Sequence, residues 1–210
     1  MSNKIITIID YGMGNIRSLQ NALNYLGYDS KVTSSPEEIK TSNILILPGV
    51  GSFGQAMKNI NNYGLKDVIT EVAIKKGIPF LGICLGMQLL ADCGEEDGIN
   101  SGLGLIPGKV LKFKSNKIRL PHIGFNSLKY RDKSSNIFRN IQNNSDFYFV
   151  HSFYYECQNE SNIIGTTEYG DEFVSAINKD NIYGFQFHPE KSQSNRLLLL
   201  NNFIKASEKI

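Results

Sequence analysis

Residues 78–90 read IPFLGICLGMQLL, an apolar run in which one cysteine stands between two glycines. The first half is typical of a buried strand and the second half of a helix. The core of the stretch, Gly82-Ile83-Cys84-Leu85-Gly86, therefore predicts a nucleophile elbow, a sharp strand-to-helix turn with cysteine as the exposed nucleophile. Small neighbours relieve crowding at such a turn, and the N-terminus of the following helix favours the thiolate. A structural buried cysteine is the alternative, and the flanking glycines count against it.

The same strand-then-helix order occurs twice before this stretch. Residues 5–10 (IITIID) and 44–47 (ILIL) are apolar enough for buried strands, and each is followed by a glycine-containing turn. After the first turn, leucines and isoleucines recur at helical spacing up to Gly27, which is a typical helix stop. Strands that alternate with helices predict a parallel sheet covered on both faces.

From about residue 109 onward the pattern changes to short strands with few helices. We expect strands at 109–113, 147–150, 163–167, 173–177 and 182–187, and a final helix over about 193–205. The asparagine-rich residues 136–144 are interpreted as a polar surface loop. No linker or repeat is visible, so residues 1–210 are predicted to form a single α/β domain with a largely parallel central sheet and a strand-rich C-terminal half.

The composition indicates a soluble globular enzyme. A net charge of +2 gives no strong field for nucleic acid or an anionic membrane, and no apolar run reaches the ~20 residues of a membrane helix. The beginning of the chain lacks the apolar core of a signal peptide. The three cysteines form no CxxC pair, and an odd number suits a reducing compartment. We therefore expect a cytoplasmic protein.

A cysteine nucleophile needs a base, and the chain has only three histidines. His188 is the strongest candidate because it ends a strand and Glu190 lies two residues further on, where a carboxylate can orient the imidazole. Cys84, His188 and Glu190 would then form a catalytic triad. A surface His–Glu pair is the alternative. His151 is interpreted as structural or as lining the pocket, and His122 as a surface loop residue; neither has the spacing of a metal site.

Backbone donors for an anionic intermediate are expected near the second predicted strand. Its end reads Pro48-Gly49-Val50-Gly51, and glycines let backbone N–H groups approach a ligand closely. The N–H of Leu85, directly after the nucleophile, would be the other donor. A simple glycine-rich turn is the alternative. The Gly12-Met13-Gly14 turn lacks the third glycine of a dinucleotide site.

Together these segments resemble a known family, the class I glutamine amidotransferases with a flavodoxin-like fold. Within that family the chain is similar to the glutaminase subunits of imidazole glycerol phosphate synthase, over nearly its whole length. The matching segments are DYGMGN (10–15), PGVGSF (48–53), GICLGMQLL (82–90), PHIGFN (121–126), FYFVHSF (147–153) and QFHPEKSQ (186–193).

The resemblance implies a glutaminase that needs no cofactor and no metal. Cys84 would form a glutamyl thioester, His188 would shuttle protons and Glu190 would orient His188. Val50, Gly51 and Leu85 would supply the oxyanion donors. The resemblance also assigns substrate glutamine to four positions: Gly49, Gln88, Glu96 and Ser152. Glu95 stands beside Glu96, and either carboxylate could instead be a solvated surface group.

The resemblance further implies a heterodimer with a barrel-shaped synthase subunit that receives ammonia and acts in histidine biosynthesis. The positions that resemble family interface residues are Asn15, Phe125, Tyr148 and Lys191. Family members usually have tryptophan where this chain has Phe125, and related subunits serve amidotransfer onto bacterial surface sugars. That pathway, a noncatalytic docking subunit and a cysteine peptidase are the alternatives.

Overall fold

The computed structural model describes residues 5–114, 118–131, 137–191 and 194–207 of the chain. Strands and helices alternate over the first part of it, as the apolar runs predict. These elements are β1 (Ile6–Ile9), α1 (Ile16–Tyr25), β2 (Ser30–Thr33), α2 (Pro36–Lys40), β3 (Ile44–Gly49), α3 (Phe53–Asn62), α4 (Leu65–Thr70), η1 (Glu71–Lys75), β4 (Phe80–Cys84) and α5 (Leu85–Gln88).

The second part consists mainly of strands and ends in a long helix. Its elements are β5 (Cys93–Gly94), β6 (Asn100–Ser101), β7 (Gly108–Lys112), β8 (His122–Tyr130), β9 (Ser145–His151), β10 (Phe153–Cys157), η3 (Glu160–Asn162), β11 (Ile163–Tyr169), β12 (Asp171–Lys179), β13 (Ile182–Phe185), η4 (Pro189–Lys191) and α6 (Ser194–Ser207). The predicted later strands correspond to β7, β9, β11, β12 and β13, and the predicted final helix to α6. Its expected first residue, Gln193, lies outside the described residues.

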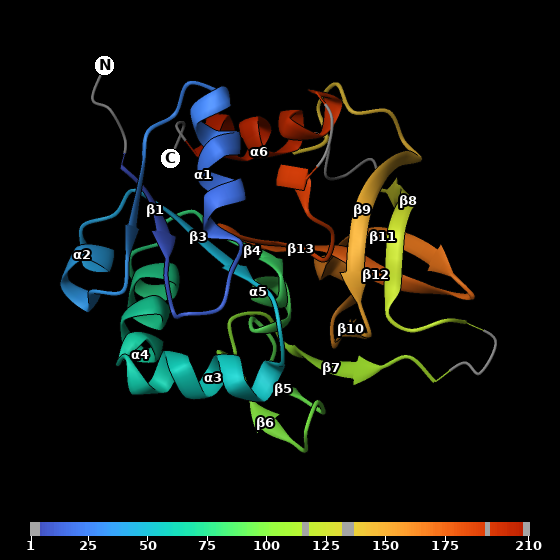
Figure 1. The fold of residues 1–210 in the computed structure, drawn as a ribbon, viewed down its shortest axis with the longest axis horizontal. Helices are drawn as coiled ribbons and strands as arrows, with labels where there is room; N and C mark the ends of the chain where they lie inside the picture. Colours follow the sequence, from blue (N-terminus) through green and yellow to red (C-terminus); the bar gives the residue numbers. More distant parts are fainter. Residues whose placement is uncertain (1–4, 115–117, 132–136, 192–193, 208–210) are drawn as a thin grey trace.

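The centre of the sheet is parallel, in the order β2-β1-β3-β4-β13. β12 pairs antiparallel with β13 and leads to the outer strands β10, β7, β5 and β6. β8 and β9 form an antiparallel ribbon that joins the sheet through β11. In Figure 1, α1 and α6 lie on one side of the parallel strands, and α3 and α4 on the other. The predicted α/β class, with a parallel centre and a strand-rich C-terminal half, is confirmed.

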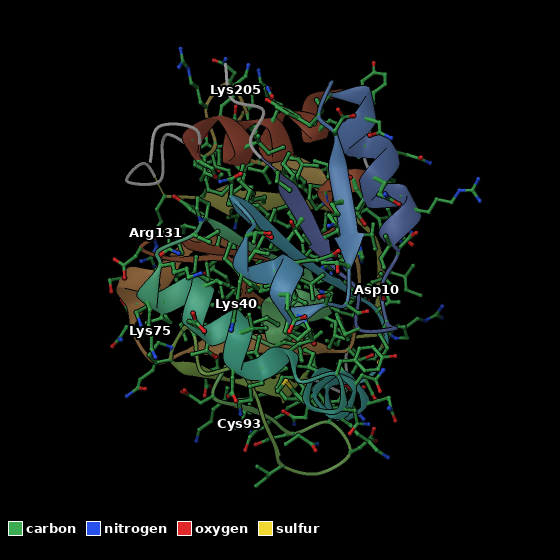
Figure 2. All side chains as sticks on the ribbon, turned by 90° about the vertical axis from the view of Figure 1, so that its left-hand side faces the viewer. Asp10, Lys40, Lys75, Cys93, Arg131 and Lys205 are labelled. Carbon is green, nitrogen blue, oxygen red and sulfur yellow. The ribbon has the colours of Figure 1, made fainter. Side chains whose placement is uncertain are left out.

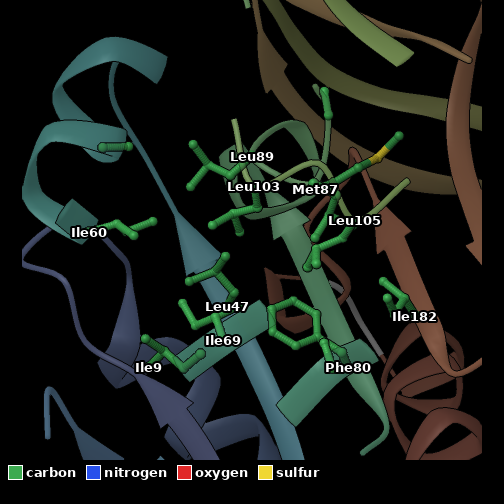
Figure 3. Close-up of a cluster of buried hydrophobic side chains, with 14 of the residues drawn as sticks. Ile9, Leu47, Ile60, Ile69, Phe80, Met87, Leu89, Leu103, Leu105 and Ile182 are labelled. Carbon is green, nitrogen blue, oxygen red and sulfur yellow. The ribbon is translucent and has the colours of Figure 1, made fainter. Parts of the chain in front are cut away.

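The alternation of side chains along the strands separates the core into two layers. Ile6 and Ile8 of β1 face the layer that contains side chains of α1 and α6, whereas Ile9 faces the layer that contains those of α3 and α4. Figure 3 shows the second layer, where Ile60 of α3 and Ile69 of α4 approach strand residues such as Leu47 and Phe80. Charged side chains lie outside these layers, among them the exposed Lys40 and Lys75 labelled in Figure 2.

The strand register brings the ends of the central strands together. Gly49 of β3 lies opposite Cys84 of β4, and Ile83 of β4 lies opposite Phe185 of β13. Because these strands are parallel, their carboxyl ends meet at one edge of the sheet, where α/β proteins place their ligands. The segments 48–51, 82–86 and 186–190 are therefore neighbours in space although they are far apart in the sequence.

Two interpretations of the C-terminal half were wrong. His122 was interpreted as a surface loop residue, but it begins β8, which pairs with β9 from His122 opposite His151 to Leu128 opposite Ser145. The asparagine-rich segment is not merely a polar surface loop, because it buries three apolar side chains, Ile137, Phe138 and Ile141. Its first residue, Asn136, lies outside the described residues.

Candidate active site

The candidate nucleophile, Cys84, lies on a strained turn where β4 meets α5. Its backbone dihedral angles are φ 55° and ψ −112°, a conformation that typically costs about 1–3 kcal/mol for a residue with a side chain. The flanking glycines permit the turn. A Cβ atom at Gly82 would lie 2.7 Å from the carbonyl carbon of Gly86, and one at Gly86 would collide with the carbonyl oxygen of Leu47. The Gly-x-Cys-x-Gly pattern thus folds into the sharp turn that it predicts.

The helix after the nucleophile is short. α5 has four residues, a single turn that ends at Gln88. Few peptide dipoles are therefore aligned behind Cys84, and the helix favours a thiolate less than a long helix would. Other groups must supply most of the electrostatic stabilisation of the thiolate.

His188 and Glu190 form a buried pair beside the elbow. Nδ1 of His188 lies 2.7 Å from Oε1 of Glu190, and the two side chains are only 2% and 4% exposed. The backbone N–H of His188 donates to the carbonyl of Tyr148 at 2.9 Å, which ties this segment to β9. The pair is therefore buried and held by backbone contacts, unlike a His–Glu pair on a solvated surface.

The surroundings of His188 favour its charged form. Burial lowers the pKa of the imidazole, but hydrogen bonds and charge interactions with Cys84 and Glu190 outweigh burial and raise the pKa of His188 to about 10. An imidazolium at this position can stabilise a neighbouring anionic nucleophile. The buried carboxylate then stabilises the imidazolium through a charge-assisted hydrogen bond.

A cavity of about 550 Å³ opens directly above Cys84. It is lined by Val50, Gly51, Ser52, Cys84, Leu85, Gln88, Glu96, Pro121, Val150, His151, Ser152, Phe153 and Lys191. Residues predicted to supply oxyanion donors, to bind substrate or to contact a partner therefore line the same cavity. Gly49, the last residue of β3, is not among the residues that line the cavity. It packs against Tyr11, whose hydroxyl would collide with a Cβ atom at this position.

The candidate oxyanion segment is divided between a strand and a loop. Pro48 and Gly49 belong to β3, and the Tyr11 hydroxyl donates to the Pro48 carbonyl at 2.9 Å. Val50 and Gly51 extend beyond the strand and line the cavity, with φ +106° at Gly51, a value that glycine adopts readily. Only the second half of Pro48–Gly51 is therefore free of the sheet.

Candidate substrate residues surround the other side of the cavity. Glu96 lines it and accepts the Phe53 backbone N–H at 2.7 Å, whereas Glu95 is exposed to solvent. Burial raises the pKa of Glu96, and the hydrogen bond from Phe53 opposes that shift. Gln88 lies deeper in the cavity and is 5% exposed. Ser152 lies between β9 and β10 and lines the same cavity.

The other two histidines form a second buried pair. Nδ1 of His122 lies 3.2 Å from Nε2 of His151, and Nδ1 of His151 lies 2.8 Å from the Phe153 carbonyl oxygen. The His122 ring stacks on Tyr169 with 3.9 Å between centroids. The prediction that His122 is a surface residue is therefore wrong. His151 packs in the core and is also part of the cavity wall. Burial lowers the pKa of His122 to about 4 and that of His151 to about 3.

Three of the four candidate interface residues gather near the cavity. The rings of Phe125 and Tyr148 lie 5.5 Å apart across the β8–β9 ribbon, and Lys191 Nζ lies 5.3 Å from the centre of the Tyr148 ring. Phe125 is 58% exposed, and its strand neighbour Ile123 is 61% exposed. Asn15 caps α1 by accepting the Ser18 backbone N–H at 3.4 Å. α1 in turn packs against η4, the turn that carries Lys191.

Two functional candidates had no signal that distinguished them in the sequence. Tyr11 supports the oxyanion segment, and Gln186 contacts Cys84 through its side chain. Among the described residues, no group of three or more histidine, cysteine or acidic side chains is placed to hold a metal ion. No helix in the described part of the chain is long and apolar enough to cross a membrane.

A cysteine on a strained elbow beside a buried histidine–glutamate pair is the arrangement of a cysteine hydrolase on an α/β scaffold. The profile of the family "Glutamine amidotransferase class-I" matches residues 7–206. The chain is also similar in fold to solved structures described as "glutamine amidotransferase" (TM-score 0.76, 19% identity, 96% of this chain and 98% of the other) and "PurLQS from Thermotoga maritima" (TM-score 0.76, 18% identity, 97% and 99%).

Sequence comparison with curated proteins indicates the subgroup of the family to which the chain belongs. The chain is 50% identical over 202 residues to the imidazole glycerol phosphate synthase subunit HisH 2 of Methanococcus maripaludis, covering 96% of this chain and 99% of the relative. It is 48% identical over 198 residues to the HisH subunit of Moorella thermoacetica, covering 94% and 93%. The chain therefore belongs to the class I glutamine amidotransferase family, within the group of HisH subunits.

Proposed function

We propose that this chain is the glutaminase subunit of imidazole glycerol phosphate synthase, which hydrolyses L-glutamine to L-glutamate and ammonia. The observation that carries the proposal is the contact of Cys84, which lines the cavity, with the buried His188–Glu190 pair, in a chain whose relatives are HisH subunits over nearly their full length. A partner cyclase would use the ammonia to make imidazole glycerol phosphate and AICAR in histidine biosynthesis.

The first half of the reaction would form a thioester. The Cys84 thiolate attacks the carboxamide carbon of glutamine, and the electron pair of the C=O bond moves to oxygen. Backbone N–H groups of Leu85 and of the Val50–Gly51 loop stabilise that oxyanion. His188, protonated and held by Glu190 at 2.7 Å, gives its proton to the departing nitrogen, so that ammonia leaves and a glutamyl thioester remains.

The second half would hydrolyse the thioester. His188, now neutral, takes a proton from water as the water oxygen attacks the thioester carbon. Collapse of the second tetrahedral intermediate breaks the carbon–sulfur bond, releases glutamate and restores the thiolate beside an imidazolium. The raised pKa of His188 beside Cys84 favours this imidazolium in the restored enzyme, ready to protonate the next departing nitrogen.

The cavity fits the two ends of a glutamine molecule. The Glu96 carboxylate at its rim offers a partner for the α-ammonium group, and the backbone at Ser152 offers hydrogen bonds at the opposite wall. Gln88 lies close to the nucleophile and would contact the reacting end. Gly49 would act indirectly, because it lets β3 run close to α5.

The partner would be a barrel-shaped, HisF-like cyclase subunit, bound as a heterodimer in the cytoplasm. Phe125, Tyr148 and Lys191 offer an aromatic and cationic surface beside the cavity, and Asn15 lies at the start of α1, which packs on η4. Ammonia released at Cys84 would leave toward this surface. The HisH relatives favour this pathway over surface-sugar amidotransfer and over a docking role without catalysis.

A Cys84→Ala variant tests the proposal. Its complex with the cyclase subunit should lose glutamine-dependent turnover by at least ~10³-fold, because the nucleophile is absent, yet keep turnover with added ammonium. Cys93→Ala is the matched control, since Cys93 is a half-buried cysteine outside the cavity lining. Glutamine turnover near the wild-type rate in Cys84→Ala would show that the nucleophile is assigned wrongly. Hydrolysis of peptides or esters but not of glutamine would show a different substrate.

A further inference from the structure

Gln186 directly follows β13 and has a fully buried side chain. Its backbone N–H donates to the Ser175 carbonyl at 2.9 Å, which fixes the residue to β12. Its side-chain Nε2 donates to the sulfur of Cys84 at 3.8 Å, and its Oε1 accepts a hydrogen bond from Gln88 Nε2 at 2.9 Å. One buried amide therefore connects the candidate nucleophile with a residue one turn further along α5.

A buried amide needs a reason, because an apolar side chain of similar shape would avoid the cost of desolvation. The contact with sulfur offers one. Besides His188, Cys84 Sγ has two polar neighbours with opposite effects. The Val150 carbonyl, 3.8 Å away, can accept a hydrogen bond from the thiol, whereas the Gln186 N–H can only donate a hydrogen bond to the sulfur lone pairs. A hydrogen bond donated to the charged form favours that form, and low surrounding polarity strengthens it.

The short α5 increases the importance of this donor, since a single helical turn adds little dipole at Cys84. We propose that Gln186 is a positioning residue for the nucleophile, whose amide holds the Cys84 sulfur in its attacking form and at the same time fixes the amide of Gln88. The proposal deepens the glutaminase function and rests on it only for the choice of reaction, because the contacts themselves require no substrate.

The second contact determines what Gln88 offers to a ligand. Gln88 Nε2 donates to the Phe153 carbonyl at 3.0 Å as well as to Gln186 Oε1. Both amide hydrogens are then used within the protein, so the polar atom that Gln88 presents to the cavity is its carbonyl oxygen. An acceptor at that place favours a ligand with an N–H group near the thiolate, such as a primary carboxamide, over a carboxylate.

A Gln186→Met variant of the full chain tests the proposal without using glutamine. Methionine keeps the length of the side chain but has neither the donor nor the acceptor. Iodoacetamide labelling is followed by peptide mass spectrometry as a function of pH, with Cys93 in the same molecule as the internal reference. We expect the labelling rate of Cys84 at pH 7 to fall about three- to tenfold, the effect of one lost hydrogen bond. The half-maximal pH of labelling should rise, and Cys93 should not change.

An unchanged pH profile of Cys84 in a folded Gln186→Met variant would overturn the proposal. If that variant does not fold, Gln186→Asn provides the same readout, because it keeps the amide but moves it one methylene away from the sulfur. An unchanged pH profile of Cys84 labelling in Gln186→Asn would also overturn the proposal. A second measurement separates this test from the proposed function. Wild-type protein that labels as expected but does not hydrolyse glutamine even with its cyclase partner and acceptor present would contradict the glutaminase assignment and leave the positioning role of Gln186 intact.

Discussion

Replacing Glu190 with glutamine should weaken catalysis without removing it. The carboxylate lies 2.7 Å from Nδ1 of His188, and both side chains are almost fully buried. Glutamine has nearly the same shape, so the packing is kept and the negative charge is lost. Because the amide can present either its oxygen or its nitrogen to Nδ1, the imidazole also loses its preference for one tautomer.

The magnitude follows from the hydrogen bond that is lost. A hydrogen bond to a charged partner contributes about 1.5–3 kcal/mol, which corresponds to a loss of about 10- to 10²-fold in kcat. His188→Asn removes the proton shuttle itself and should cost more. The same charge helps to raise the pKa of His188 to about 10. Folding stability from the imidazolium is therefore complete below the ordinary pKa of ~6.5 and is lost as the pH rises toward about 10.

Steady-state glutaminase kinetics of the complex, with denaturant unfolding at pH 6.5 and pH 10, measure both effects. Wild-type protein should be more stable than Glu190→Gln at pH 6.5, and the difference should decrease toward pH 10. Equal and negligible losses of kcat in Glu190→Gln and His188→Asn would refute the triad. A greater loss in His151→Asn than in His188→Asn would show that the other buried histidine is the base.

Three further outcomes are expected. Gly86→Ala should destabilise the fold by about 1–3 kcal/mol, because its Cβ atom would collide with the backbone carbonyl of Leu47. Thermal unfolding measures this loss, with Gly54→Ala as the control, because a Cβ atom at Gly54 would meet only the movable Asn100 amide. Wild-type stability should fall with pH below ~6.5 toward 3, by up to ~1.4 kcal/mol per pH unit, because unfolding lets His151 take up a proton; urea titrations of His151→Asn should show a shallower slope. Partner and acceptor together should stimulate the isolated chain at least ~10²-fold, equivalent to ~3 kcal/mol of barrier, and Lys191→Ala should reduce that stimulation while an exposed-lysine control does not.

The parts that the sequence predicts well are those set by local chemistry. A Cβ atom at Gly82 would collide with Gly86 inside the turn itself, so the glycine pattern around Cys84 indicates a sharp turn from local sequence alone. The apolar runs of β1, β3 and β4 are buried on both faces, as parallel central strands require. Those features depend on neighbours within a few residues, and a single sequence contains them.

Contacts between distant segments could not be predicted in this way. β8 begins beside Pro121 and contains Gly124 and Asn126, residues that usually indicate a turn, yet pairing with β9 makes it a strand. His122 is buried partly by the rings of Tyr169 and Phe149, which stack against it from distant parts of the sequence. The contact of Gln186 with the nucleophile likewise joins residues 102 positions apart.

The division of the candidate oxyanion segment, Pro48–Gly51, between strand and loop limits how a partner could regulate hydrolysis. Pro48 is held by the Tyr11 hydroxyl, and Gly49 is paired with Cys84, so neither can rotate without breaking the sheet. A change that turns an N–H group toward the oxyanion must therefore occur at Val50–Gly51, where the backbone is free of the sheet and glycine tolerates either sign of φ. This loop and Lys191 line the same cavity. A partner that contacts Lys191 could thus change the backbone conformation of Val50–Gly51 on the same cavity, with no movement of the triad itself.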